Sequence, residues 1–291
     1  MSDVCAVVVT YNPDSVKLAA LLDAISRQVR HVVIVDNASK SPIQANGAVL
    51  LQNVGNVGLA AALNQGIAWG LSAGADYILT LDQDSSPGPD MVRLLLHDAQ
   101  RIDQPVAAVG PSLEDPRSGR AYPFVKFGFP NNTQMVITDL TECDFLITSG
   151  CLTPAASFQT IGLMNETLFI DNVDMEWCFR AKAKGFGIYG SASAKMAHEI
   201  GDALISVPVL KRKRILVHGP VRLYYIMRNR VLLYWMPHVT RQWVAQDLLR
   251  IPFKFGIFAL LVPGQWSNIK HMVLGLWHGI RGVTGAYPTP R

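Results

Sequence analysis

Short apolar runs separated by helical patterns restrict this chain to an α/β fold. Residues 5–10 (CAVVVT) and 31–36 (HVVIVD) are continuous apolar segments of strand length, which is typical of strands buried in a parallel sheet. Between them, residues 18–25 place leucine and isoleucine at helical spacing. A strand, a helix and a second strand within about 30 residues form a βαβ unit, whose crossover is right-handed. The pattern predicts a mainly parallel sheet flanked by helices.

The same alternation predicts the remaining elements. Further strands are expected at 49–51, 77–82, 106–110, 145–148 and 186–189. Helices are expected at 59–71, at 91–101, in a segment that ends at Lys184 before Gly185, and at 221–234, because of their apolar spacing and end signals. Residues 111–132 are rich in Gly, Pro and aromatic residues, and we expect an irregular, substrate-facing loop there.

The composition argues against several classes of protein. The chain has 291 residues, of which 49% are apolar and 16% charged, enough for one large domain or one domain with an appendage. It contains no run of about 18 uncharged apolar residues, which argues against a membrane-spanning helix. The first residues lack a basic secretory signal. The 4 cysteines form no C-x-x-C pair, which favours reduced, buried thiols.

Charge is distributed unevenly along the chain. Residues 201–291 carry 13 Lys or Arg against 2 Asp or Glu, whereas residues 1–200 carry 13 against 20. This basic, aromatic tail, which includes Lys211–Arg214, leaves nucleic acid and an anionic membrane surface open as partners. The apolar segment 251–262 is interrupted by Pro, Lys and Gly and is too short to span a bilayer. It can lie in the membrane interface or pack on the rest of the chain or on a second copy.

The carboxyl end of the strand expected at 77–82 carries the clearest chemical signal. Asp82 and Asp84 are one residue apart, so in extended backbone their side chains point to the same side. Open α/β sheets bind ligands at the carboxyl ends of their strands, and two carboxylates there suit Mg²⁺ or Mn²⁺ that carries a phosphate. The alternative is that the pair caps a helix that starts near Pro89.

Three further stretches are candidates for binding or catalysis. The turn at 53–58 enters a helix N-terminus, an arrangement suited to phosphate, although it is neither a G-x-G-x-x-G motif nor a P-loop. Asp171, Asp174 and Glu176 stand at the start of another helix; capping explains some of them, and one can be a general base. His198 is either structural or the third ligand of a divalent metal.

A set of motifs in a fixed order carries a family resemblance. The motifs lie at 9–13 (VTYNP), 34–39 (IVDNAS), 56–66 (NVGLAAALNQG), 81–85 (LDQDS), 148–150 (TSG) and 171–180 (DNVDMEWCFR). They resemble those of family 2 inverting glycosyltransferases of GT-A fold, and within these the bacterial rhamnosyltransferases that use dTDP-L-rhamnose. The resemblance covers roughly residues 4–235.

The resemblance implies a GT-A architecture, a Rossmann-like, mixed and mainly parallel sheet flanked by helices. It implies a catalytic domain at residues 1–205, with a nucleotide-sugar half at about 1–110 and an acceptor half at about 111–205. Residues 206–291 would form a basic, aromatic helical extension that contacts a membrane surface or a second copy.

The resemblance also implies roles for single residues. Asp36 corresponds to the acid that accepts the pyrimidine N3–H, which fits uracil or thymine, and Asp174 corresponds to the catalytic base. The metal ligands, for Mg²⁺ or Mn²⁺, are Asp82, Asp84 and His198. The nucleotide-sugar residues are Thr10, Tyr11, Asn12, Asp36, Asn56, Gly58, Asn64, Asp82 and Gln83, and the acceptor residues are Gly150 and Trp177.

The chain departs from the family pattern at two positions. Val173 stands where many relatives carry an acid beside the base, so Glu176 and Asp171 remain alternative bases. A leucine stands where some relatives carry a basic residue before the Asn of the 56–66 motif. We therefore expect Arg222 and Arg228, together with the metal, to neutralise the donor phosphates.

The implied function is transfer of L-rhamnose from dTDP-L-rhamnose to a hydroxyl of a saccharide acceptor, lipid-linked, in the synthesis of cell-surface polysaccharide. A UDP-sugar donor, such as one that carries galactofuranose, is the alternative within the family. A nucleotidyltransferase and a non-enzymatic membrane-surface adaptor are the alternatives from other classes. We expect a cytoplasmic enzyme, peripheral on the inner face of the plasma membrane, with no nucleic-acid partner and with a homo-oligomer left open.

Overall fold

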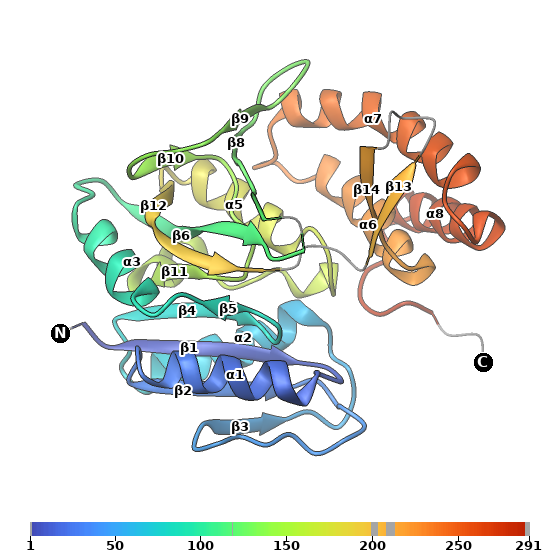
Figure 1. Cartoon of the computed structure of the whole chain (residues 1–291). Coiled ribbons are helices and arrows are strands. Elements are labelled where there is room, and N and C mark those ends of the chain that lie inside the picture. The colour runs from blue at the N-terminus through green and yellow to red at the C-terminus, as the bar shows by residue number, and fades with distance from the viewer. Residues whose placement is uncertain (1, 118, 199–202, 208–212, 289–291) are drawn as a thin grey trace. The chain divides into compact units, whose positions relative to one another are not determined.

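The chain divides into two compact units, each described here by itself. The computed structural model describes residues 2–117, 119–198, 203–207 and 213–288 (Figure 1). The first unit, which we call the sheet unit, comprises residues 1–126, 133–166 and 173–199. The second, the helical unit, comprises residues 127–132, 167–172 and 200–291. The domain boundary expected after residue 205 stays a prediction.

Helices separate the strands in the first part of the sheet unit, whereas β6 to β11 follow one another without a helix (Figure 1). Its strands are β1 (Val4–Thr10), β2 (His31–Asp36), β3 (Val49–Gln52), β4 (Tyr77–Asp82), β5 (Ser86–Pro87), β6 (Val106–Asp115), β7 (Arg120–Ala121), β8 (Phe124–Lys126), β9 (Thr133–Met135), β10 (Thr141–Cys143), β11 (Cys151–Pro154) and β12 (Gly187–Ala197). Its helices are α1 (Ser15–Ser26), α2 (Leu59–Ser72), α3 (Met91–Gln100), α4 (Ala155–Ile161) and α5 (Val173–Ala183).

A 10-stranded sheet forms the centre of this unit, with the path β10-β12-β6-β11-β4-β1-β2-β3 and with β5 and β7 paired to β12 and β6. Strands β1, β2, β3 and β4 pair in parallel, as do β6 and β12. Strand β11 runs antiparallel between β4 and β6. The expected mixed, mainly parallel sheet flanked by helices is confirmed.

Each face of the sheet is covered by its own apolar core. Side chains of β1 alternate between the two cores, as the pleat of a strand requires: Val4, Ala6 and Val8 pack with α1 and α3, and the intervening residues pack with α2, α4 and α5. Gly66 lets α2 approach β1 closely, because a Cβ at this position would lie 2.3 Å from Val7 Cγ1.

One expected strand is misplaced. Residues 145–148 form an isolated bridge at Phe145 and no strand, and β11 begins three residues later, at Cys151. Two features explain the difference. The Thr80 hydroxyl of β4 donates to the Thr148 carbonyl at 2.6 Å, and Gly150 adopts φ 85°. These contacts fix a turn where the apolar pattern indicated a strand. Residues 111–132 are also more regular than expected, because β6, β7 and β8 extend through them.

The helical unit contains α6 (Pro220–Tyr234), α7 (Arg241–Leu260), α8 (Gln265–Ile280) and the hairpin of β13 (Ala203–Val207) with β14 (Lys213–Val217). Lys211 and Arg212 of the expected basic cluster lie outside the described residues. Phe258 and Val262, within the apolar segment 251–262, are buried in the core that α6, α7 and α8 share. Among the described residues, no helix is long and apolar enough to cross a membrane.

Hydrogen bonds attach two short segments to these helices. Gln246 on α7 donates to the carbonyls of Gly128 and Pro130 at 2.7 and 3.0 Å. Asn229 on α6 donates to the carbonyls of Leu168, Ile170 and Asp171 at 2.7–2.9 Å. Residues 127–132 and 167–172 therefore belong to the helical unit although they interrupt the sheet unit in sequence.

Two helix glycines of this unit form a matched pair for a stability test. A Cβ at Gly275 would lie 2.4 Å from the Tyr224 carbonyl oxygen, whereas a Cβ at Gly256 would meet nothing within 4 Å. We expect Gly275→Ala to destabilise the unit by about 1–3 kcal/mol through overpacking. Gly256→Ala should stabilise it by about 0.5–1 kcal/mol through helix propensity. Urea unfolding followed by circular dichroism measures both; equal shifts of the two midpoints would contradict the close α6–α8 packing.

Candidate metal and nucleotide site

The strand register brings three predicted residues to one edge of the sheet. Thr10, the last residue of β1, stands beside Asp36 of β2. On the other side of β1, Val9 stands beside Asp82 of β4. The carboxyl ends of these parallel strands therefore meet, as expected for a ligand site in an open α/β sheet.

Asp82, Asp84 and His198 form a compact cluster at this edge. His198 Nε2 lies 3.5 Å from Asp82 Oδ2, and its Nδ1 lies 4.0 Å from Asp84 Oδ1. One ligand atom of each residue lies within 4.8 Å of the other two. His198 reaches the acids because Met196 and Ala197 of β12 pair with Pro87 and Ser86 of β5.

The cluster fits a divalent cation. His198 is 6% exposed, and its buried Nδ1 has no hydrogen-bond partner among the described residues. An unpaired buried nitrogen is costly, and a metal ion would satisfy it. The two carboxylates are each 38% exposed, which leaves one side of the cluster open to a ligand. Two carboxylate oxygens and one imidazole nitrogen are suitable donors for Mn²⁺ and acceptable ones for Mg²⁺.

Two buried serines hold the turn that carries the acids. The Ser149 hydroxyl accepts a hydrogen bond from the Asp82 N–H at 3.1 Å and lies 2.5 Å from the Ser85 hydroxyl. The exposed fractions of Ser149 and Ser85 are 2% and 3%. Sequence reasoning missed both as site residues, although Ser149 lies in the 148–150 motif. Gly150, the predicted acceptor residue, has φ 85° and no space for a Cβ beside Pro111 and Met196.

Asp36 is completely buried and organises the first turn of the site. Its carboxylate accepts hydrogen bonds from the Thr10 hydroxyl at 2.9 Å, from the Ser39 N–H at 3.0 Å and from the Ser39 hydroxyl at 2.5 Å. These contacts close the loop after β2 against the end of β1. Recognition of a pyrimidine by Asp36 stays a prediction, and it requires a lone pair that these three donors leave available.

Tyr11 and Gln83 are held together through the Tyr11 backbone. The Tyr11 N–H donates to Gln83 Oε1 at 2.7 Å, and Gln83 Nε2 donates weakly to the Tyr11 carbonyl at 3.4 Å. The residue Tyr11 remains 49% exposed. The aromatic face is therefore available for stacking, while Gln83 connects the β1 and β4 ends of the site.

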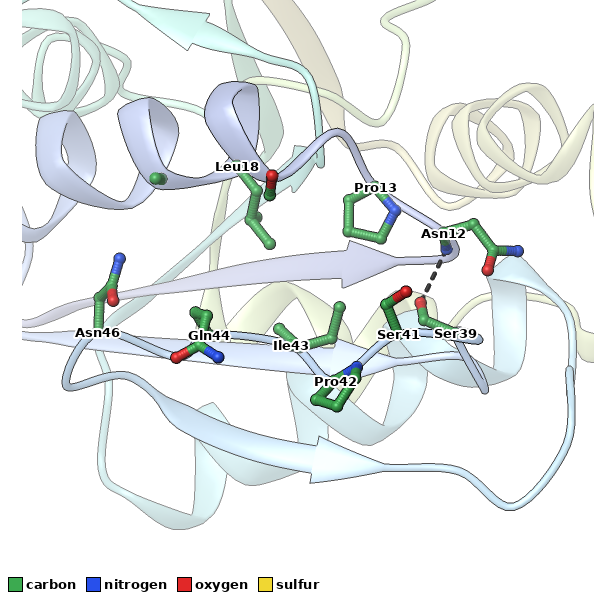
Figure 2. A pocket seen from close by; sticks show the side chains of 11 residues that line it. Asn12, Pro13, Leu18, Ser39, Ser41, Pro42, Ile43, Gln44 and Asn46 are labelled. Atoms are coloured by element: carbon green, nitrogen blue, oxygen red, sulfur yellow. Dashed lines mark hydrogen bonds between the residues drawn. The ribbon is translucent and has the colours of Figure 1, made fainter.

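A cavity of about 370 Å³ borders Asn12 (Figure 2). It lies between the start of α1, with Pro13 and Leu18, and the segment from Ser39 to Asn46, and no residue that lines it is charged. The Asn12 N–H donates to the Ser39 hydroxyl at 2.7 Å, as the dashed line in Figure 2 marks. Ser39 also donates hydrogen bonds to Asp36. The cavity therefore adjoins the residues predicted to bind the nucleobase.

Asn56 and Gly58 shape the loop that precedes α2. Asn56 Oδ1 accepts from Asn37 Nδ2 at 3.0 Å and from the Gly58 N–H at 2.9 Å, and Gly58 has φ 90°. Asn37, which sequence reasoning did not single out, accepts from the Val57 N–H at 2.9 Å. Asn64 is turned elsewhere: its amide exchanges two hydrogen bonds with the Met164 backbone. Nucleotide binding by these residues stays a prediction.

Asp174 lies in the first turn of α5 and close to Cys151. Burial first, and then Cys178 and the Asp174 carboxylate, raise the pKa of the Cys151 thiol. Cys151 lies two residues after Ser149, so the charge of Asp174 acts on the segment next to the turn that carries the acids. Glu176, an alternative base, is 1% exposed and receives two hydrogen bonds from Arg180 at 2.8 and 2.9 Å, which favours a structural role.

Trp177, the second predicted acceptor residue, is 4% exposed. Its indole N–H donates to the Gly162 carbonyl at 2.9 Å, and its ring packs at 5.8 Å from that of Phe158. These contacts explain its burial by packing alone, and contact with an acceptor stays a prediction.

Arg228 and Arg222 contact the segment 167–172 inside the helical unit. Arg228 is fully buried, and its guanidinium donates to the carbonyls of Leu168 and Gly285. Arg222 Nε donates to Asp171 Oδ1 at 3.0 Å, and its side chain is 38% exposed. Burial disfavours phosphate binding by Arg228, while Arg222 keeps an accessible face. Asp171, the other alternative base, is thereby paired with a cation.

Comparisons with known proteins agree with this geometry. Residues 5–161 match the family described as Glycosyl transferase family 2. The chain is 31% identical to "dTDP-rhamnosyl transferase RfbF" of Shigella flexneri, over 98% of this chain and 97% of that protein. It is 25% identical to "Galactofuranosyltransferase GlfT1" of Mycolicibacterium smegmatis, over 92% of this chain and 95% of that protein.

Two solved structures share the fold at low identity. "GalNAc-T7 with UDP, GalNAc and Mn2+" has a TM-score of 0.62 at 13% identity, over 97% of this chain and 56% of that one. "S. aureus TarS 1-349 in complex with UDP-GlcNAc" has a TM-score of 0.57 at 15% identity, over 97% of this chain and 81% of that one.

Removal of a predicted metal ligand, His198 or Asp84, should weaken metal binding. We expect His198→Ala and Asp84→Ala each to lower Mn²⁺ affinity at least about tenfold, as measured by titration calorimetry. The control is Asp103→Asn, an exposed carboxylate away from the cluster, which should leave the affinity unchanged. Equal affinity in His198→Ala and the wild type would rule out the histidine as a ligand.

Ser149→Ala tests the support of the acid turn. Loss of the hydroxyl leaves the buried Asp82 N–H and Ser85 hydroxyl short of a partner, so we expect a loss of stability of about 1–3 kcal/mol. Mn²⁺ affinity should also fall about tenfold, as for other outer-shell residues. The control is Ser112→Ala, which removes a hydrogen bond to the Ser191 carbonyl. It should lower the stability but leave the Mn²⁺ affinity unchanged. A Ser149→Ala protein with normal Mn²⁺ affinity would contradict this positioning role.

Proposed function

Since the chain belongs to glycosyl transferase family 2, we propose that this glycosyltransferase moves L-rhamnose from dTDP-L-rhamnose to a hydroxyl of a saccharide acceptor, with inversion. The observation that carries the proposal is the Asp82–Asp84–His198 cluster at the carboxyl edge of the sheet. Identity of 31% over nearly the whole length of a dTDP-rhamnosyl transferase supports the choice of sugar. A galactofuranosyl donor is the second candidate, because a galactofuranosyltransferase matches at 25%.

The proposed donor site extends from β1 to the metal cluster. The Tyr11 ring would stack on the thymine. Asp36 would accept a hydrogen bond from the N3–H of that base, and Asn56 and Gly58 would border the nucleoside. Asp82, Asp84 and His198 would hold Mg²⁺ or Mn²⁺, which neutralises the diphosphate and stabilises the leaving nucleotide. Arg222 is the proposed second source of positive charge.

Asp174 is the proposed general base. Its carboxylate would accept the proton of the acceptor hydroxyl while the oxygen attacks the anomeric carbon opposite the diphosphate. The new carbon–oxygen bond forms as the bond to the diphosphate breaks, so a β-L-donor would give an α-L-rhamnoside. A second catalytic acid is unnecessary, because dTDP leaves readily. Glu176 is 1% exposed and bonded to Arg180, and Asp171 is bonded to Arg222, which argues against either of these two as the base.

The proposed acceptor is a lipid-linked saccharide at the cytoplasmic face of the plasma membrane, with the enzyme peripheral on that surface. The net positive charge of residues 201–291, which carry 13 basic against 2 acidic residues, supports an anionic membrane surface over a neutral one. The product would enter the synthesis of a cell-surface polysaccharide.

A donor screen tests the proposed activity. Thermal shifts with dTDP-, UDP- and GDP-sugars in Mn²⁺ should be largest with dTDP-L-rhamnose. Incubation with this donor and a saccharide acceptor should release dTDP. Release of inorganic diphosphate from dTTP and a sugar 1-phosphate would instead indicate a nucleotidyltransferase, and the absence of both dTDP and diphosphate would favour the adaptor. A larger shift with the UDP-galactofuranose donor would select the second candidate.

Asp174→Asn tests the base. The amide keeps the size of the side chain but cannot accept the acceptor proton, so we expect turnover to fall at least about a hundredfold. Donor affinity, measured by calorimetry, should change less than twofold, roughly the precision of such comparisons. Turnover near the wild-type level would move the base to another residue.

A further inference from the structure

The exposed face of α8 is apolar and aromatic. Trp266, Val273, Trp277 and Ile280 are 85%, 52%, 53% and 65% exposed. Their spacing of seven, four and three residues places them on one side of the helix. The other side of α8 is already occupied, because Asn268 and Met272 are buried and Gly275 contacts α6. The exposed stripe therefore lies on the side of α8 that faces away from α6.

Helix α7 carries a second exposed apolar stripe. Leu249, Phe253 and Leu260 are 57%, 75% and 74% exposed, and spacings of four and seven residues again place them on one side of their helix. Large apolar side chains gathered in this way mark an interaction surface rather than the scattered exposure that is normal on a protein.

The exposed charged side chains that the structure describes on these helices are basic. Exposed residues Arg241, Arg250, Lys270 and Arg281 lie on α7, on α8 or directly after it. Lys270 is spaced four residues from Trp266 and three from Val273, so it shares their stripe, and the Arg281 guanidinium lies 5.4 Å from the Trp277 ring centroid. Asp247 is the only acidic residue that the sequence carries between 220 and 288. It is buried and bonded to Arg230 and Tyr234.

The length of α8 suits a helix that lies in the membrane surface. Its 16 residues extend about 24 Å, short of the roughly 30 Å hydrocarbon core. Tryptophan is enriched at the boundary between headgroups and acyl chains. A basic and apolar face on a helix of this kind is typical of interfacial binding to anionic lipid.

We propose that α8 lies in the headgroup layer of an anionic membrane. Trp266, Val273, Trp277 and Ile280 enter the acyl boundary, and Lys270 and Arg281 contact lipid phosphates. The inference rests on the proposed function, in that it supplies the surface by which an enzyme with a lipid-linked acceptor stays beside it. A symmetric dimer through the same stripe is disfavoured, because it would bring like charges together without an exposed acid to pair them.

Flotation of the full-length protein with lipid vesicles tests this inference. Wild-type protein should bind vesicles that contain phosphatidylglycerol, bind pure phosphatidylcholine much more weakly, and lose affinity at high salt. Trp266→Ser combined with Trp277→Ser should weaken binding at least about tenfold, equivalent to about 1.4 kcal/mol. Lys270→Gln combined with Arg281→Gln should reduce the preference for anionic lipid.

The matched control is Val136→Ser, which replaces an 86% exposed valine of the sheet unit and should bind vesicles like the wild type. Unchanged vesicle binding in the double tryptophan variant would overturn the inference. A dimer that light scattering detects in the wild type and that the same variant abolishes would overturn it in favour of a second copy. Nucleotide-sugar binding, measured on the same proteins, distinguishes the two proposals. Vesicle binding without donor binding would refute only the proposed transferase function. Donor binding without vesicle binding would refute only the membrane contact of α8.

Discussion

Backbone pairing of β1 with β2 on one side and β4 on the other is the constraint on which the site depends. Because the three strands are parallel and in register, backbone pairing alone brings Thr10, Asp36 and Asp82 to one edge of the sheet. The two apolar cores fix this register, since a slip of one residue would exchange the faces of β1. Apolar side chains in the two cores thus determine which polar side chains reach the carboxyl edge of the sheet.

The position of His198 in the predicted metal cluster depends on a different element, strand β12. Strand β12 continues eight residues beyond the predicted end at residue 189, and its last residues pair with the two-residue strand β5 directly after the acids. This pairing converts a separation of more than 110 residues between Asp84 and His198 into a contact of 4.0 Å. His198 is thereby buried beside the two acids, where it is placed to serve as the third ligand that the sequence predicted.

How much the sequence could predict is best judged from particular residues. The strands at 5–10, 31–36 and 77–82 were predictable because a buried parallel strand is apolar throughout. Ser149 was not, because its hydrogen bond to Asp82 joins residues 67 apart in sequence and leaves no local pattern. Helix α8 shows the deeper difficulty. Periodicity alone would bury its large apolar stripe, whereas the structure buries the small residues Gly275 and Gly279 against α6 and exposes the tryptophans.

The chain that leads into α5 is held from outside the sheet unit. Phe169, Asp171 and Asn172 all adopt left-handed φ angles of 60–66°, which are unfavourable for a phenylalanine in particular. Asn229, Arg228 and the stacked ring of Tyr225 supply the contacts that fix them. Asp174 follows two residues later, so the turn that precedes its helix is fixed within the helical unit. A shortened chain that ends before α6 would retain every predicted metal ligand and yet lose the contacts that fix the turn before the predicted base.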